Sequence, residues 1–264
     1  MKLKGKTAIV TGASQGIGKG IALELADAGA NVVINYNNNK EAATKVREEI
    51  NNLKRNAIIV KADVSKQDEV KHLVEEAINK YHKIDILVNN AGIFIGGPIE
   101  NLKEQDWERV IDVNLKGVFL CCQAVGKNMI SNKSGGSIIN IASISGSMPE
   151  INLGAYTPSK AGVIGLTRLL AIEWAKYNIR VNSISPGPIM TALQRKAYNT
   201  VDLLNARNNA IPMQRHGKPE EIGKLAVFLA YDDSSFITGE DIKADGGSIN
   251  SLFYLVHRSI RNNS

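Results

Sequence analysis

Tyr156 and Lys160 are the residues of this chain whose types and spacing point most directly to chemistry. On a helix, side chains four residues apart share one face, one turn apart. A phenol has a pKa of about 10, but an ammonium group within ~4–6 Å favours the phenolate and lowers that value. Ser143 follows an apolar run, so its hydroxyl could hold a substrate oxygen against Tyr156. An amphipathic helix with a snorkelling lysine is the alternative interpretation.

Pro158 lies between these two residues and has no N–H to donate. Proline is tolerated in the first turn of a helix, where the N–H would be unpaired in any case. We therefore expect the helix to begin near Ala155, shortly after Gly154.

Three glycines follow a β-rich run at residues 7–11 and precede a helical pattern. Gly12 permits a tight turn, and Gly16 and Gly18 let backbone N–H groups approach a pyrophosphate at the start of the helix. The spacing G-x3-G-x-G differs from the common G-x-G-x-x-G fingerprint, so a plain tight turn is the alternative.

Strand and helix patterns alternate along most of the chain, which predicts an α/β fold: one doubly wound parallel sheet of Rossmann type with helices on both faces. Strands are expected at 7–11, 31–36, 57–62, 84–89, 137–143, 179–185 and 241–244. Helices are expected at 40–53, 68–81, 103–131, about 155–177 and 219–229. The carboxyl ends of parallel strands meet at one edge, where ligands bind. That edge would gather Gly12, Tyr36, Asp63, Asn90, Ser143 and Pro186.

Residues 1–264 show no linker or internal repeat and are expected to form one dinucleotide-binding catalytic domain. A helical segment of mixed polarity at about 190–212 is placed where a substrate lid would lie. The extension 248–264 contains the apolar run 252–256, which we expect to pack on its own domain or on a sister subunit.

Composition narrows the function classes. The net charge of +6 is scattered, so we expect no nucleic-acid partner. Cys121 and Cys122 are adjacent, which fits neither a disulfide framework nor a metal site and favours a reducing compartment. No signal peptide or membrane-length apolar run is visible, so we expect a cytoplasmic protein without membrane contact.

The motifs, taken together and in order, resemble the short-chain dehydrogenase/reductase family from about residue 4 to residue 247. The matching positions are Thr11-Gly-x-x-x-Gly-Ile-Gly18, Asp63-Val64, Asn89-Asn-Ala-Gly92, Asn114, Ser143, Tyr156-x-x-x-Lys160 and Pro186-Gly-x-Ile-x-Thr191. The resemblance implies hydride transfer between a nicotinamide and a carbonyl or secondary alcohol. It makes Tyr156 the general acid/base, with Lys160 lowering its pKa, Ser143 orienting the substrate oxygen, and Asn114 holding a water in a proton relay.

The resemblance also implies a set of cofactor-binding residues. Asp63 and Val64 would contact the adenine, residues 90–92 would line the cleft, and Ile189 and Thr191 would meet the nicotinamide amide and the phosphates. The full set is Gly12, Ser14, Gln15, Gly16, Ile17, Gly18, Tyr36, Asn37, Asp63, Val64, Asn90, Ala91, Gly92, Tyr156, Lys160, Pro186, Gly187, Ile189 and Thr191.

The residues after the second strand bear on the choice of cofactor. An acid there would bind the ribose 2′-OH and repel a 2′-phosphate, but residues 35–40 contain none, and the first is Glu41. Gln15 and Asn37 stand where NADP-preferring relatives often carry basic residues. We expect NADP(H) to be preferred and NAD(H) to be usable.

The chain resembles two branches of the family, the glucose 1-dehydrogenases and the 3-oxoacyl-carrier-protein reductases. The polar residues of 190–213 favour a sugar or polyol, with the acyl thioester as the alternative. A dinucleotide-sensing protein without turnover is a more distant hypothesis, since such a protein would be expected to lack Tyr156 or Lys160. Family members usually form tetramers through the helices near 103–131 and 155–177, so a homotetramer is expected.

Overall fold

A seven-stranded sheet forms the centre of the computed structural model, which describes residues 1–197 and 200–251. The strand order is β3-β2-β1-β4-β5-β6-β7, and every neighbouring pair is parallel. The predicted parallel sheet is therefore confirmed. The strands are β1 (Thr7–Val10), β2 (Asn31–Tyr36), β3 (Ala57–Lys61), β4 (Ile86–Asn89), β5 (Gly136–Ile141), β6 (Ile179–Pro186) and β7 (Asp241–Ala244).

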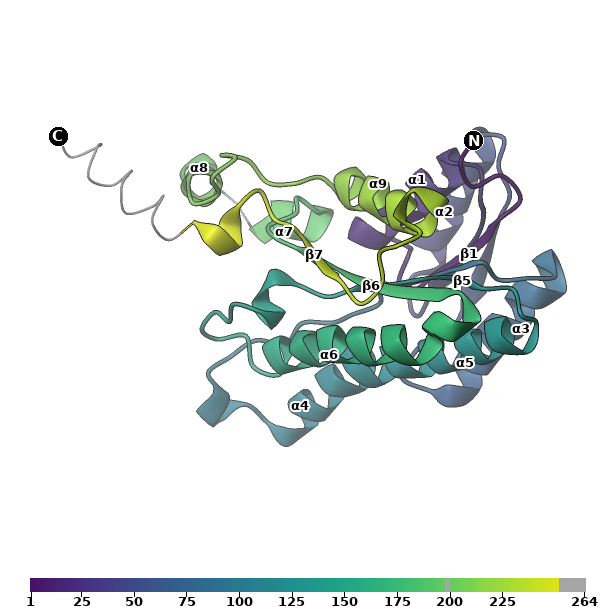
Figure 1. Ribbon diagram of the computed structural model, residues 1–264. Coiled ribbons are helices and arrows are strands. Elements are labelled where there is room, and N and C mark those ends of the chain that lie inside the picture. The colour runs from purple at the N-terminus through teal and green to yellow at the C-terminus, as the bar shows by residue number, and fades with distance from the viewer. Residues whose placement is uncertain (198–199, 252–264) are drawn as a thin grey trace.

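Helices cover both faces of the sheet, as Figure 1 shows. One layer contains α1 (Gly16–Asp27), α2 (Lys40–Asn52) and α9 (Pro219–Ala230), and the other contains α3 (Gln67–Tyr81), α5 (Gly117–Ser131) and α6 (Tyr156–Trp174). A separate apolar core lies on each face. The strands read as continuous apolar runs because both of their faces are buried by helices.

The strand order reverses between β1 and β4, which lie side by side although β2 and β3 separate them in the chain. In open parallel sheets, ligands bind in the crevice outside the carboxyl ends at such a switch point. The segments that follow β1, β4, β5 and β6 carry most of the candidate site residues, and the sheet brings them to this one edge.

The start of α6 agrees with the sequence prediction. The helix begins at Tyr156 with Ala155 at its N-cap, after Gly154 at φ +53°. Pro158 is thus the third helical residue, where its missing N–H leaves no intrahelical bond unmade.

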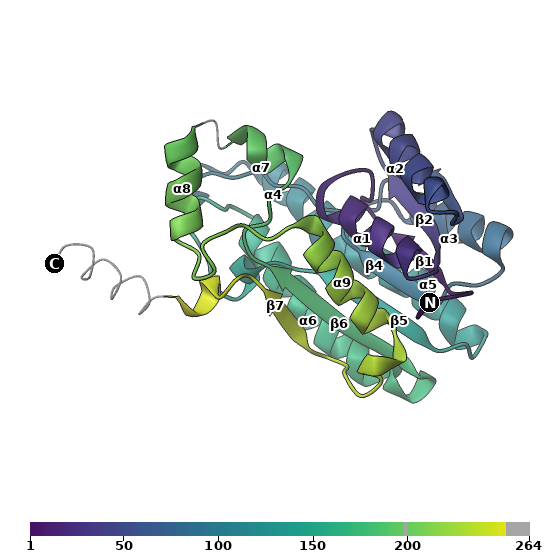
Figure 2. The same cartoon turned by 90° about the horizontal axis from the view of Figure 1, so that it is seen from above.

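Two predicted helices are divided in the structure. The stretch 103–131 consists of α4 (Glu104–Ile111), a π-helical turn (Asp112–Lys116) and α5. The stretch 190–209 contains α7 (Ala192–Ala197) and α8 (Val201–Asn209). Figures 1 and 2 show α7 and α8 beyond one end of the sheet, outside the two helical layers. Of the extension, residues 248–250 form a short 3-10 turn, and the apolar run 252–256 lies outside the described residues.

Among the described residues, no helix is both long and apolar enough to cross a membrane.

The contact between α1 and α9 depends on small residues, which yields a first prediction. A Cβ at Gly223 would lie 2.6 Å from Glu24 Cγ and 2.8 Å from the Gly20 carbonyl oxygen. We expect Gly223→Ala to lower the free energy of unfolding by about 1–3 kcal/mol through overpacking, measured by urea denaturation. Lys224→Ala, exposed on the same helix, is the control and should stay within about 0.5 kcal/mol. An unchanged Gly223→Ala midpoint would contradict this account of the contact.

Candidate functional site

The glycine turn after β1 has a geometry that only glycine can supply. Gly12 and Gly16 have φ values of +60° and +57°. A Cβ on Gly12 would lie 2.8 Å from Ala91 Cα, and one on Gly18 would lie 2.4 Å from Asn90 Nδ2. The turn is therefore pressed against the segment after β4, which leaves no room for a side chain at position 12 or 18.

Hydrogen bonds from Thr11 and Asn90 fix this contact. The Asn90 and Ala91 backbone N–H groups donate to Thr11 Oγ1 at 2.9 and 3.0 Å. Asn90 Nδ2 donates in return to the carbonyl oxygens of Thr11 and Gly12 at 3.0 and 3.1 Å. Both the backbone and the side chain of Asn90 are therefore bonded to the glycine turn, and these bonds fix the shape of the turn.

Asn35 is a residue of the site that the sequence analysis did not single out. Its Oδ1 accepts from the Gly12 N–H at 3.1 Å, and its Nδ2 donates to the Ala62 carbonyl at 2.9 Å. The side chain is 1% exposed, so it links the ends of β1 and β3 across β2 inside the core. The sequence feature that could have identified Asn35 is its position as a polar residue inside the otherwise apolar run 32–36.

The predicted adenine end lies at the ends of β2 and β3. The Asp63 carboxylate accepts from the Ser65 N–H and hydroxyl at 3.0 and 2.7 Å. Partial burial raises the pKa of Asp63, but the hydrogen bonds from Ser65, with Lys66 and Asn37, outweigh it and lower the pKa overall. Asp63 is therefore ionised at neutral pH and can accept a further hydrogen bond.

Tyr36 and Val64, also predicted to bind cofactor, are buried in the apolar cores at 7% and 6% exposure. Val64 packs on Gly117, where a Cβ would lie 2.8 Å from Val64 Cγ2. Because these two side chains are buried, a ligand at this end would contact the backbone of the two strand ends and the exposed side chain of Asn37.

Asn114 occupies the π-helical turn and is fully buried. Its Oδ1 accepts from the Ile93 N–H at 2.8 Å, and its Nδ2 donates to the Ile93 carbonyl at 2.9 Å and to Ser159 Oγ at 3.2 Å. Ser159 donates in turn to the Tyr156 carbonyl at 2.6 Å. The turn therefore joins the segment after β4 to the first turn of α6, and a π-turn within a helix is frequent at functional sites.

Ser143, Tyr156 and Lys160 converge as predicted. Ser143 follows β5 and makes a hydrogen bond that lowers the pKa of the Tyr156 phenol. Lys160 Nζ lies 5.7 Å from the centre of the Tyr156 ring and donates to the Ile141 carbonyl at 2.8 Å. A Cβ on Gly92 would lie 3.7 Å from Lys160 Nζ and 3.3 Å from Asn114 Oδ1, so the expected cleft reaches both groups.

The pKa values differ from the sequence expectation in one respect. Burial raises the pKa of Tyr156, and the Ser143 hydrogen bond offsets this only in part. Lys160 is 4% exposed, and burial lowers its pKa to about 8. The sequence indicates that the Lys160 ammonium group lies close to the Tyr156 phenol. It does not show that burial disfavours both the phenolate and the ammonium form. The phenol is therefore protonated at neutral pH, as a proton donor must be.

The segment after β6 meets the glycine turn. A Cβ on Gly187 would lie 2.6 Å from Asp245 Cα, so glycine is required beside the loop after β7. Ile189 is buried and pairs with Gly217. A Cβ on Gly16 would lie 3.5 Å from Thr191 Cγ2. The two predicted phosphate contacts, far apart in the chain, are therefore neighbours.

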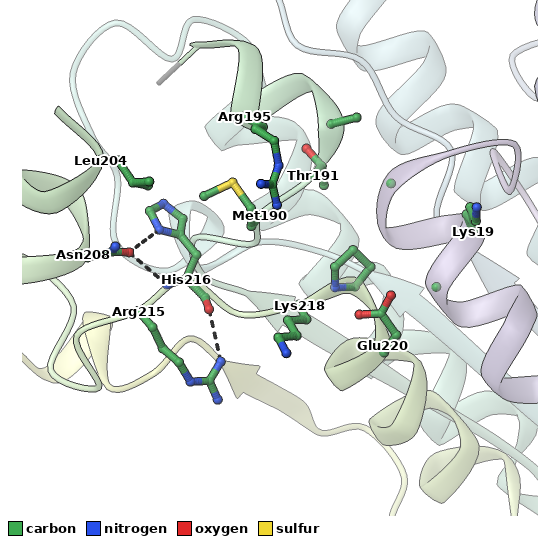
Figure 3. Close-up of a pocket in the computed structure, with 14 residues that line it drawn as sticks. Lys19, Met190, Thr191, Arg195, Leu204, Asn208, Arg215, His216, Lys218 and Glu220 are labelled. Atoms are coloured by element: carbon green, nitrogen blue, oxygen red, sulfur yellow. Dashed lines mark hydrogen bonds between the residues drawn. The ribbon is translucent and has the colours of Figure 1, made fainter. Parts of the chain in front are cut away.

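A pocket of about 560 Å³ opens beside this contact, between the glycine turn, the predicted lid and the start of α9 (Figure 3). Its lining includes Arg195 and Lys218, while Arg215 is engaged by Glu221 at 2.7 Å. His216 is 6% exposed, and its Nδ1 lies 2.7 Å from Asn208 Oδ1, which ties the loop before α9 to α8. Ser143 and Tyr156 are not among the lining residues described, so the pocket adjoins the phosphate end of the site.

The remaining predicted residues lie where the strand order requires. Ser14 and Ile17 are half-buried and Gln15 is exposed, all in the turn at the start of α1, and Pro186 ends β6. The arrangement fits a dinucleotide: an open glycine turn at a helix start, a cleft beside Gly92, and a phenol, a hydroxyl and an ammonium group at its end.

The burial of Lys160 yields a second prediction. Its pKa of about 8 in the folded chain lies below its ordinary 10.5, so between these pH values the unfolded chain binds more protons and the contribution to stability rises with pH. The unfolding free energy of the wild type relative to Lys160→Met should rise by up to about 3 kcal/mol from pH 8 to 10.5. Urea denaturation across that range measures it.

The exposed Lys176→Met variant is the matched control for Lys160→Met and should show no such rise. A pH-independent difference for Lys160→Met would contradict the burial of the ammonium group.

Comparison with known proteins shows similarity along most of the chain. The family model described as Enoyl-(Acyl carrier protein) reductase matches residues 12–248. The 3-oxoacyl-(acyl-carrier-protein) reductase FabG of Staphylococcus epidermidis is 43% identical over 242 residues, which cover 92% of this chain and 98% of that protein.

Solved structures with similar folds also match along nearly the full chain. A provisionally named short-chain alcohol dehydrogenase of Sinorhizobium meliloti is 39% identical with a TM-score of 0.90, covering 95% of this chain and 99% of that one. A provisionally named 2-deoxy-D-gluconate 3-dehydrogenase of Agrobacterium tumefaciens, solved with bound NADP, is 35% identical with a TM-score of 0.87, covering 94% and 98%.

Proposed function

We propose that this chain, which belongs to the short-chain dehydrogenase/reductase family of NAD(P)-dependent oxidoreductases, reduces the 3-oxo group of an acyl thioester held on an acyl carrier protein. The observation that carries the proposal is the 43% identity, over nearly the full length of both chains, to a reductase named for that substrate. The sugar or polyol favoured by the residue mixture of 190–213 has weaker support, so the order of the two substrate predictions is reversed.

The chemistry assigned to the site follows from its contacts. A bound reduced nicotinamide would supply the hydride to the carbonyl carbon. Ser143 donates a hydrogen bond to the oxygen on which charge develops, and Tyr156, whose raised pKa keeps it protonated, gives that oxygen its proton. The ammonium group of Lys160 then stabilises the phenolate.

The predicted cofactor contacts become part of this proposal. The N–H groups of the glycine turn and Thr191 would hold the phosphates, and the strand-end segments would hold the adenosine and nicotinamide ends. Asn114 would order the segment beside Lys160 through Ile93 and Ser159, with its predicted water relay added to that role.

The positively charged side chains near the proposed lid are relevant to binding of an acyl carrier protein. An acidic carrier needs positive charge near the site, and Arg195 and Lys218 provide it at the pocket under α7 and α8, which adjoins the phosphate end. We propose 190–212 as the substrate lid because α7 and α8 lie over this end of the sheet. The buried free thiols Cys121 and Cys122 are in keeping with a reducing compartment such as the cytoplasm.

A homotetramer is part of the proposal. The long helices present apolar side chains to solvent, at 42% exposure for Phe119 on α5 and at 52% and 80% for Leu169 and Ile172 on α6. Apolar surface of this kind on long helices is typical of subunit interfaces.

The catalytic assignment yields a third prediction. Tyr156→Phe should lower kcat for reduction of an acetoacetyl thioester by about 10²–10⁴-fold, because the variant lacks the proton donor. Stopped-flow or steady-state loss of NADPH absorbance measures it. Tyr177→Phe, a partly exposed tyrosine near the end of the same helical stretch, should keep wild-type turnover.

Unchanged turnover in Tyr156→Phe would overturn the catalytic assignment of Tyr156, whereas a wild type that binds the dinucleotide without turning over any substrate would favour the dinucleotide-sensing hypothesis. A second substrate candidate comes from the Agrobacterium relative named for 2-deoxy-D-gluconate. A panel of aldoses, polyols and sugar acids run against 3-oxoacyl thioesters separates the two, and kcat/KM higher for a sugar than for every thioester would restore the first expectation.

The cofactor preference yields a fourth prediction. The nearest acid after β2 is Glu41, and its carboxylate is engaged by Lys45 at 2.7 Å, so the residues directly after β2 offer no unpaired carboxylate to repel a 2′-phosphate. We propose that NADP(H) is preferred and NAD(H) accepted. Asn38→Asp places a carboxylate at this end and should lower the NADPH-to-NADH ratio of kcat/KM at least about tenfold.

Asn51→Asp makes the same charge change at the exposed end of α2 and should leave the ratio within about twofold. A strict NADH dependence of the wild type would overturn the preference itself.

A further inference from the structure

Ser145 is a buried hydroxyl residue in the turn directly after Ser143. It lies in the short 3-10 helix Ile144–Gly146 and is 6% exposed. Its Oγ is 2.7 Å from Ser143 Oγ, and its backbone N–H donates to Ser143 Oγ at 3.2 Å. No role for Ser145 follows from the sequence motifs.

The direction of the Ser143–Ser145 hydrogen bond follows from counting donors. A hydroxyl has one proton and two acceptor positions. If Ser143 donated to Ser145, the proton of Ser145 would lack an acceptor, because the described part of the chain gives its Oγ no other hydrogen bond. A buried donor without an acceptor is costly. The favoured arrangement therefore has Ser145 O–H donating to Ser143 Oγ.

In that arrangement both acceptor positions of Ser143 Oγ are filled, one by the Ser145 N–H and one by the Ser145 O–H. The Ser143 proton is then left to point toward the reacting oxygen. The hydrogen bond from Ser143 to the Tyr156 phenol is consistent with this, because it lowers the phenol's pKa and so favours the phenolate, as a donated bond does.

We propose that Ser145 is a positioning residue that fills the acceptor sites of Ser143 and makes the Ser143 hydroxyl an obligatory donor to the oxygen that changes charge. The inference rests on the catalytic role proposed above for Ser143. It gives the site a direction: Ser143 stabilises an oxyanion or a phenolate and does not compete for the proton that Tyr156 transfers.

Neutron diffraction from deuterium-exchanged crystals of the wild type tests the arrangement without requiring turnover. We expect the deuterium of Ser145 between the two Oγ atoms and that of Ser143 directed toward Tyr156 Oη. A deuterium on Ser143 directed at Ser145 Oγ would overturn the proposal. Failure of the proposed substrate or cofactor would leave this readout unaffected, so the two failures are distinguishable.

Kinetics of three variants give a second test, on the full chain with NADPH and an acetoacetyl thioester. Ser145→Ala should lower kcat about tenfold with the KM for NADPH within about twofold, because the Ser143 proton is no longer fixed. Its alkaline limb of kcat should move to higher pH, since the Tyr156 pKa rises when donation from Ser143 weakens.

Ser145→Thr retains the hydroxyl and should recover both kcat and the pH profile, and Ser147→Ala, exposed in the same turn, should match the wild type. A drop in kcat for Ser145→Ala with an unshifted pH profile and no rescue by threonine would overturn the proposal in favour of a structural role.

Discussion

The geometry of the site depends on one hydrogen bond, which the buried ammonium group of Lys160 donates to the Ile141 carbonyl. This hydrogen bond ties the second turn of α6 to the end of β5, two residues before Ser143. Burial disfavours the charge, which is why the pKa falls to about 8. The apolar packing of α6 against the sheet offsets that cost. Tyr156 and Ser143 are consequently held together by the protein before any ligand binds.

Buried amides extend the same principle across the sheet. Asn89 Nδ2 donates to Asn140 Oδ1 at 2.8 Å, and Asn140 Nδ2 donates to Thr167 Oγ1 at 2.9 Å. This series of hydrogen bonds joins β4, β5 and α6 inside the core, just as the hydrogen bonds of Asn35 join the ends of β1 and β3. Buried polar groups are costly unless they are hydrogen-bonded, so these bonds fix the relative positions of the elements that they join. The edge that carries the site is therefore cross-linked by hydrogen bonds within the core.

The segment proposed as a substrate lid lies in a different part of the molecule. The helix α8 buries none of its residues and lies outside the two layers, so its sequence is not constrained by a core. Residue mixture in such a segment carries little information on the ligand, which explains why the sugar preference inferred from 190–213 has less support than the acyl thioester. The reaction type rests instead on residues anchored to the sheet.

The sequence alone determined the parallel sheet, the start of α6 and the convergence of Ser143, Tyr156 and Lys160. These features follow from local patterns, namely apolar runs, glycine turns, the Pro158 constraint and the i, i+4 spacing, which act through the backbone. The π-turn at Asn114, the anchoring role of Asn35, the raised pKa of Tyr156 and the Ser143–Ser145 pair were decided by the tertiary structure. Each of them depends on burial and on partners distant in the chain or fixed by the fold, and desolvation is a property of the assembled core that no local pattern contains.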